Sequence, residues 1–161
     1  MRDFNRMRTS DPTMPVNRAT LTQEPAKAAE QGITLTLPGA PRTKKNRGKI
    51  WKAGKRTIIM PAQPWMDWRD SLVRWQVETR FHPTHLGFDY DLNCCALFYR
   101  DARRGDAVGY YQGLADVLEE LCVVYNDRAI TQWDGSRMLV DKANPRVELV
   151  LTPVTRPLGA A

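Results

Sequence analysis

The sequence predicts an α+β fold in which a mixed β-sheet packs against two main helices. Apolar and polar residues alternate near both ends of residues 32–154, a pattern typical of half-buried strands. Between these segments, two stretches repeat apolar residues every three or four positions, as amphipathic helices do. The resulting order is strand, hairpin, helix, strand, helix and further strands, which together indicate the mixed sheet.

Length and charge narrow the class of protein. The 161 residues suffice for one compact domain and are too few for two domains of ordinary size. A net charge of +6 favours an anionic partner, of which nucleic acid is one candidate. The three cysteines show no metal-binding spacing, which predicts reduced, buried thiols in a cytoplasmic protein. No apolar run reaches membrane-spanning length and no signal-peptide core is present, so we expect no membrane partner.

Three regions follow from composition. Residues 1–31 are interrupted by Pro12, Pro15 and Pro25 and have no hydrophobic period, which predicts a flexible, basic N-terminal arm. Residues 32–154 form the predicted domain, and residues 155–161 form a C-terminal tail.

The first predicted elements are a strand, a basic loop and a hairpin. Residues 33–37 alternate as a half-buried strand that Pro38-Gly39 ends. Five cations follow within eight residues: Arg42, Lys44, Lys45, Arg47 and Lys49. They repel one another, and a phosphate backbone would supply the missing counter-charge; the alternative is a solvated loop tip. Residues 49–51 and 56–60 flank Ala53-Gly54 as a β-hairpin.

A helix and a buried strand come next. Residues 65–80 place Trp65, Trp68, Leu72 and Trp75 at helical spacing. We expect these tryptophans in the core and not on nucleobases, because aromatic residues on one helical stripe usually pack inside. Residues 91–100 are almost continuously apolar, which predicts a central strand buried on both faces.

The second helix carries the acidic residues of interest. Asp106 is a suitable N-cap for a helix that begins at Ala107. The predicted buried stripe consists of Ala107, Tyr111, Leu114, Ala115, Leu118, Leu121 and Cys122. Gly109 and Gly113 share another face with Asp116 and Glu120. Glycine is unfavourable inside a helix, so we expect a backbone or a ligand to approach that face closely.

A metal site is one interpretation of these acids. A short apolar strand at 123–125 returns to the sheet, and the Asn126-Asp127 turn would bring Asp127 near Asp106. Clustered carboxylates repel one another unless a divalent cation neutralises them, and their hard oxygens suit Mg²⁺. In the alternative interpretation, Asp106 is only a cap, Asp116 and Glu120 are solvated, and the glycines admit a neighbouring helix.

The C-terminal part completes the predicted sheet. Residues 129–133 and 137–140 flank Asp134-Gly135, which predicts a two-residue hairpin turn between two strands. Residues 147–152 alternate as the last strand.

Three motifs in this order resemble the RusA family of Holliday junction resolvases, over residues 33–152. They are LPGAPRTKKNRG, the RRGD that opens the second helix and continues to Asp116-Val117-Leu118, and the Asn126-Asp127 turn. The resemblance implies a RusA-like fold and a homodimer that cleaves four-way DNA junctions with Mg²⁺ held by aspartates. By position, Asp106, Asp116 and Asp127 match the catalytic and metal-binding acids. The implied DNA contacts are Lys44, Lys45, Arg47, Lys49, Arg103 and Arg104.

Two positions depart from the family pattern. Val108 stands where the family has a second catalytic aspartate, and Gln112 stands where it has a lysine. A valine cannot ligate a metal, and a glutamine cannot neutralise a phosphate. Three hypotheses follow. The chain is a nuclease in which Asp116 or Glu120 completes the Mg²⁺ site, a protein that binds branched DNA without cleaving it, or a basic α+β protein whose acids are surface charges.

Overall fold

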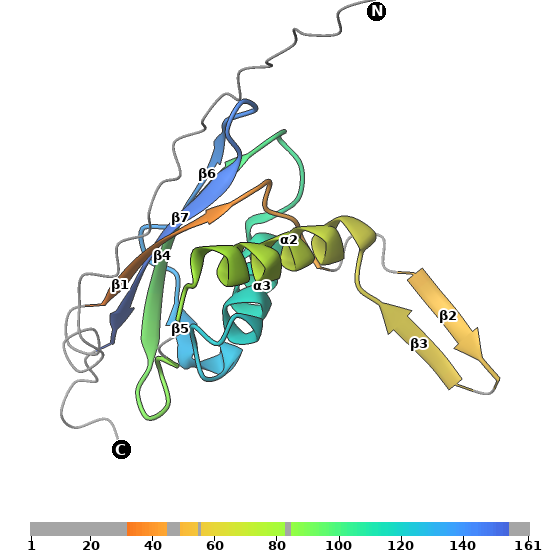
Figure 1. Cartoon of the computed structure of the whole chain (residues 1–161), viewed down its shortest axis with the longest axis horizontal. Coiled ribbons are helices and arrows are strands. Elements are labelled where there is room, and N and C mark those ends of the chain that lie inside the picture. The colour runs from red at the N-terminus through yellow and green to blue at the C-terminus, as the bar shows by residue number, and fades with distance from the viewer. Residues whose placement is uncertain (1–31, 45–48, 55, 83–84, 155–161) are drawn as a thin grey trace, which may run out of the picture.

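The structure is a computed structural model that describes residues 32–44, 49–54, 56–82 and 85–154. The predicted arm at 1–31, the tail at 155–161, and Lys45 and Arg47 of the basic loop lie outside the described residues. The described part is the predicted α+β fold: a mixed sheet with two main helices on the same side of it (Figure 1). Neither helix is long and apolar enough to cross a membrane.

The sheet has five strands, and its centre is antiparallel. The strands are β1 (Ile33–Pro38), β4 (Leu92–Arg100), β5 (Ile130–Gln132), β6 (Arg137–Val140) and β7 (Arg146–Pro153). β7 lies between β1 and β4 and is antiparallel to both. The predicted central strand is present, but only one of its faces is buried: every second residue of β4 is buried and the others are half-buried. The prediction of burial on both faces is wrong, because the two helices cover the same side of the sheet (Figure 1).

The predicted hairpin at Asp134-Gly135 is wrong. β5 pairs in parallel with the start of β4, and β6 pairs in parallel with its end, so the chain runs on along one sheet edge. Ser136 Oγ donates to the Cys94 carbonyl oxygen and accepts from the Ala96 amide, both at 2.9 Å. The Asp134 amide donates to Asn93 Oδ1 at 2.9 Å. These bonds to β4 hold the turn in place, so it interrupts the edge strand without reversing it.

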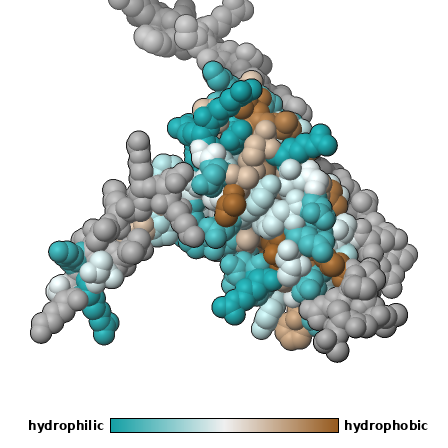
Figure 2. Space-filling model, turned by 180° about the vertical axis from the view of Figure 1, so that it is seen from behind, coloured by the Kyte–Doolittle hydropathy of each residue, from teal (hydrophilic) through white to brown (hydrophobic). Residues whose placement is uncertain are grey.

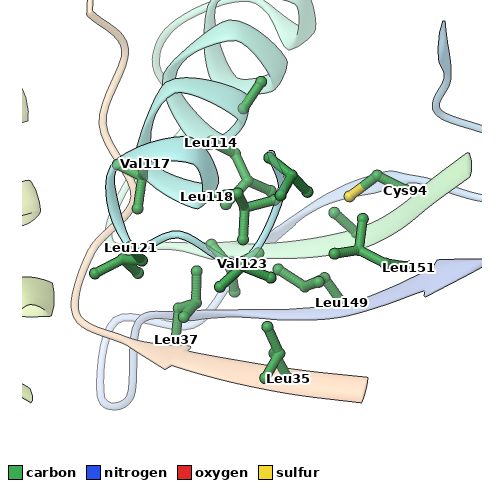
Figure 3. Packing of buried hydrophobic residues seen from close by; sticks show 14 of the residues in the cluster. Leu35, Leu37, Cys94, Leu114, Val117, Leu118, Leu121, Val123, Leu149 and Leu151 are labelled. Carbon is green, nitrogen blue, oxygen red and sulfur yellow. The ribbon is translucent and has the colours of Figure 1, made fainter. Parts of the chain in front are cut away.

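The first helix, α2 (Gln63–Thr79), has Pro64 in its first turn and ends at Arg80 in a left-handed conformation. Trp65, Trp68 and Leu72 are buried, and Trp75 is partly buried against the core, which confirms the prediction that the tryptophans of this helix pack inside. They join the side chains between the helices and the inner face of the sheet, of which Figure 3 shows a part. Leu37, Leu149 and Leu151 from the sheet meet Leu114 and Leu118 from the second helix there.

The second helix, α3 (Ala107–Glu120), begins where the sequence predicts. Asp106 is its N-cap, and Oδ1 accepts a hydrogen bond from the Gly109 amide at 2.6 Å. The buried face differs from the predicted stripe: Tyr110 and Val117 are also buried, whereas Ala107, Tyr111 and Cys122 are only half-buried. The difference arises because α3 is covered on a second side by α2 and by the segment after β1.

The segment after α3 is not the predicted strand. Val123 and Val124 are buried, but Val124 makes only a single parallel bridge with Leu86. Two backbone hydrogen bonds of 2.9 and 2.8 Å, from Leu86 to Val123 and from Tyr125 to Leu86, hold it there. It leads into a short 3-10 helix, η1 (Asp127–Ala129).

The predicted hairpin of β2 (Lys49–Ala53) and β3 (Arg56–Met60) is confirmed. It projects away from the sheet and helices (Figure 1). Seen from behind, the described surface shows small groups of apolar residues scattered among hydrophilic side chains (Figure 2).

Candidate nucleic-acid cleft

A cleft of about 670 Å³, here called the central cleft, is lined by two of the three predicted acids, Asp116 and Asp127. Its walls come from α3, η1, the start of the β5 edge, and the chain on either side of the β2–β3 hairpin. The lining residues are Lys44, Met60, Pro61, Val108, Tyr111, Gln112, Ala115, Asp116, Asp127, Arg128, Ile130 and Trp133.

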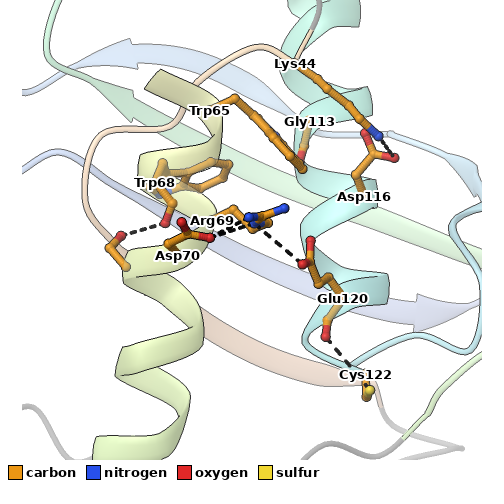
Figure 4. Close-up of polar contacts among 10 residues, drawn as sticks. Lys44, Trp65, Trp68, Arg69, Asp70, Gly113, Asp116, Glu120 and Cys122 are labelled. Carbon is orange, nitrogen blue, oxygen red and sulfur yellow. Dashed lines mark hydrogen bonds and ion pairs between the residues drawn. The ribbon is translucent and has the colours of Figure 1, made fainter. Parts of the chain in front are cut away.

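Asp116 lies on α3 and forms an ion pair with a lysine that three contacts hold in place. Lys44 Nζ lies 2.9 Å from Asp116 Oδ1 and 5.2 Å from the centroid of the Trp65 ring (Figure 4). The carbonyl oxygen of Lys44 accepts from the Ala62 amide at 3.1 Å, just before α2 begins. The Lys44 ammonium is therefore positioned by its backbone, by an aromatic face and by a carboxylate.

Asp127 reaches the central cleft from η1. The Asp127 amide donates to Glu119 Oε2 at 3.0 Å, which ties η1 to the end of α3. Asn126 caps η1 through Oδ1, which accepts from the Arg128 amide at 3.1 Å. The first contact ties Asp127 to the helix that carries Asp116, and the second fixes the turn in which Arg128 follows it.

The structure brings two of the three predicted acids into one cleft. Asp116 and Asp127 both line it, together with Val108 and Gln112, the two positions that depart from the family pattern. Asp106 is not a lining residue, and its carboxylate is engaged at the helix start. Among the described residues, no group of three His, Cys, Asp or Glu side chains could hold a metal ion. Carboxylate ligands for a cation in this cleft would therefore be Asp116 and Asp127.

The close approach predicted at the glycines of α3 is made by protein. A Cβ added at Gly113 would lie 2.7 Å from the Arg42 carbonyl oxygen. Trp65 Nε1 donates to the Gly113 carbonyl at 3.1 Å, and Thr43 packs against Gly109. Glycine at these positions lets α2 and the segment carrying Lys44 come close to α3.

Glu120, the other acid considered on this helix, does not line the central cleft. Its Oε1 lies 3.5 Å from Arg69 Nε, and Arg69 also pairs with Asp70 at 2.6 Å (Figure 4). Glu120 thus belongs to an ion-pair network between the two helices, where Arg69 neutralises it.

Arg103 and Arg104 lie apart from the central cleft. They line a hollow of about 760 Å³ at the start of α3, together with Arg100, Gly105 and β6. Arg104 pairs with Asp101 at 2.9 Å, whereas Arg103 forms no hydrogen bond or ion pair with any described residue. Arg103 is therefore available to an external anion. Lys49, the remaining predicted DNA contact within the described residues, opens β2 on the projecting hairpin.

Asp101 is a residue that the sequence reasoning missed. Arg42 donates to both of its carboxylate oxygens, at 2.9 and 2.8 Å, and Arg104 donates to one of them. The side-chain hydrogen bond from Arg42, helped by the charges of both arginines, lowers the pKa of Asp101 below its ordinary value. The bidentate ion pair between Arg42 and Asp101 joins the segment carrying Lys44 to the end of β4.

The cleft also contains three residues that the predicted site omitted: Tyr111, Arg128 and Trp133. Arg128 directly follows the predicted site residue Asp127, so the sequence alone indicated that a cation lies next to this acid. Trp133 lies beside α3 because β5 and β6 both pair with β4; a hairpin at Asp134-Gly135 does not predict that position.

No protein-family model matches the chain, and no curated protein matches it in sequence. The likeness to RusA resolvases therefore rests on the quoted motifs.

Proposed function

We propose that this chain is a Mg²⁺-dependent, structure-specific endodeoxyribonuclease that resolves four-way DNA junctions in the manner of the RusA family. One observation carries the proposal: Asp116 and Asp127 line the same cleft as Lys44 and Arg128. Carboxylates beside cations suit a phosphodiester, because the acids attract a hard cation and the basic groups attract the phosphate.

The two carboxylates fit Mg²⁺ as a partial ligand set. Mg²⁺ is commonly held by one or two carboxylates, with substrate phosphates and water as the remaining ligands. Asp116 and Asp127 would hold the cation, and the DNA phosphate would complete its shell. When bound, Mg²⁺ lowers the pKa of a water ligand and stabilises the charge that develops at the phosphate.

The basic side chains bind and orient the scissile phosphate. The Lys44 side chain is partly exposed, so its ammonium can exchange Asp116 for a DNA phosphate while its backbone stays held, which leaves that carboxylate free for the cation. Arg128 supplies a second positive group from η1. Gln112 contributes amide donors without charge, so Lys44 compensates for the lysine that the family pattern has at position 112.

The partner of the enzyme is branched DNA, and the active form is a homodimer. Two symmetric nicks in one junction require two active sites related by a twofold axis. Arg103 and Arg104 extend the contact with the DNA backbone beyond the central cleft. We place the activity in the cytoplasm, because three free cysteines suit a reducing compartment.

Binding without cleavage is the second candidate function, and two observations favour it. Val108 lines the central cleft and offers no metal ligand where the family has an aspartate. Lys44 already neutralises Asp116 at 2.9 Å. In this reading the cleft receives a phosphate and holds no cation.

The test is cleavage of a labelled four-way junction over a range of Mg²⁺ and Mn²⁺ concentrations. We expect paired symmetric nicks from the wild type and none from Asp127→Asn, because an amide cannot replace a carboxylate ligand. Asp89→Asn is the matched control: Asp89 is exposed, does not line the cleft, and should nick like the wild type.

Two other outcomes would change the proposed function. Retention of a junction in a mobility shift, without nicks in either metal, would replace the nuclease with the binding function. Equal affinity for a junction and a linear duplex would contradict both proposals.

A further inference from the structure

We infer that the central cleft receives an unpaired nucleobase at the branch point, with the indole ring of Trp133 as its stacking surface. This inference rests on the proposed function and adds a substrate feature to it: DNA branches with unpaired bases at the crossover.

A column of aromatic rings runs from the core to the central cleft. Phe98 is fully buried, and its ring lies 5.8 Å from the ring of Tyr111. Tyr111 stacks on Trp133 with centroids 4.6 Å apart and planes 7° from parallel. Tyr111 and Trp133 are half-buried and line the cleft. Trp133 is the last ring of the column, so a further flat ring would extend an existing stack.

Trp133 is held firmly enough to serve as a platform. It lies in the short break between β5 and β6, where its carbonyl oxygen accepts from the Ser136 amide at 3.1 Å. Asp134 and Ser136, the residues on either side of Gly135, are bonded to β4. A ring fixed in this way loses little conformational entropy when a ligand stacks on it.

Part of the lining of the central cleft is apolar. Val108, Ala115 and Ile130 line the same cleft, as do Met60 and Pro61 from the end of the β2–β3 hairpin. Apolar side chains do not contribute to binding a phosphate, because a phosphate is recognised by charge and hydrogen bonds. A planar base can pack against these apolar side chains. Val108 adds to them, because it stands where the family pattern has an aspartate.

The basic residues of the cleft complete a nucleotide site. Lys44 and Arg128 line it together with the aromatic stack, so one pocket offers both a ring surface and phosphate partners. Bases inside a duplex are stacked between neighbours and cannot enter such a pocket. The occupant is therefore a base that is already unpaired at the branch.

The experiment compares two four-way junctions, one fully paired and one with two unpaired adenines at the crossover, by fluorescence anisotropy. We expect the wild type to bind the unpaired junction about tenfold more tightly, and Trp133→Leu to lose that preference. Trp133→Phe keeps a ring and should retain part of the preference. Tyr125→Leu removes an exposed aromatic that does not line the cleft, and should bind like the wild type.

Three results would overturn the inference or its basis. If Trp133→Leu and Trp133→Phe both keep the full preference for unpaired adenines, the stacking role is wrong while the proposed function stands. If dAMP competes with the junction at equal concentration in the wild type and not in Trp133→Leu, the site serves a free nucleotide. If the wild type binds neither junction better than linear duplex, the proposed function fails as well.

Discussion

At the scale of single residues, Asp106 combines a structural role with a predicted catalytic one. Its Oδ1 accepts a hydrogen bond from the Gly109 amide at 2.6 Å, and Asp106 does not line the central cleft. The resemblance to the RusA family implies that the same residue is a metal ligand. The two roles respond differently to substitution, because asparagine preserves a cap and removes a charge.

We therefore predict that Asp106→Ala lowers the free energy of unfolding by about 1 kcal/mol, and that Asp106→Asn leaves it near the wild-type value. Both variants should still nick a junction in proportion to their folded fraction. Urea denaturation and the nicking assay on the same preparations check this. A fully stable Asp106→Asn that cannot nick would make Asp106 a metal ligand, as the resemblance implies.

Asp101 gives a second prediction at this scale, in the pH dependence of stability. Its folded-state pKa is lowered, mainly by the hydrogen bond from Arg42, so its ionised form is favoured in the folded state. The resulting stabilisation is present above the ordinary pKa of 3.8 and is lost as pH falls through the folded-state value.

We expect Asp101→Asn to melt at a lower temperature than the wild type at neutral pH. This difference in melting temperature should persist down to about pH 5. It should disappear below the ordinary pKa of Asp101, as Asp101 of the wild type becomes protonated. Asp89→Asn, whose carboxylate forms no ion pair with the described residues, is the control and should show no such gap. A gap that stays constant down to pH 2 would show that packing, not charge, is responsible.

At the scale of elements, α3 is the part that both the core and the central cleft depend on. One side carries buried Leu114 and Leu118, and another carries Gly113 beneath the Arg42 carbonyl and Trp65. The side with Val108, Gln112 and Asp116 faces the cleft. The helix tolerates two interior glycines because the segment carrying Lys44 and the first helix pack closely against it at those positions.

We predict that Gly113→Ala destabilises the protein despite the higher helix propensity of alanine. Alanine gains about 1 kcal/mol from propensity, but its Cβ would lie 2.7 Å from the Arg42 carbonyl oxygen and force α3 and that segment apart. Overpacking of this kind costs about 1–3 kcal/mol, so a net loss should appear in urea denaturation. Gln112→Ala, one position away and exposed, should leave stability nearly unchanged. A more stable Gly113→Ala would mean that the segment carrying Lys44 moves freely.

Both helices and the hairpin of β2 and β3 were predictable because their signals are local. Helical spacing, Asp106 as a cap and Ala53-Gly54 as a turn depend on neighbours in sequence. The path of β5 and β6 was not predictable in this way. Asp134-Gly135 is a good hairpin turn in isolation, but Asn93, Cys94 and Ala96 of β4 bind that turn from about forty residues away. Long-range hydrogen bonds outweighed the local turn preference.

At the scale of the whole molecule, the proposed activity requires more than one copy of the chain. A junction has two strands to nick at symmetric positions, and each described domain contains one central cleft with one pair of carboxylates. The projecting hairpin of β2 and β3 extends well beyond the compact part of the domain (Figure 1).

We expect sedimentation velocity on a four-way junction to give a complex that contains two protein copies. A linear duplex of the same total length should not support that stoichiometry, because it lacks the twofold arrangement of arms. A strict monomer on the junction, at concentrations where every junction is bound, would contradict the dimer.

The fold class, the approximate bounds of most elements, and the acidic and basic residues available for chemistry could all be inferred from the amino-acid sequence. These follow from periodicity, caps and charge, which local sequence encodes. Which acids share a site depends on the packing of distant segments: Asp116 and Asp127 both line the central cleft, while Asp106 is used at the helix start. That packing also places Lys44 against Asp116 and Trp133 beside Tyr111. The physical reason is that each of these contacts joins segments whose approach depends on strand pairing and helix packing across the whole domain.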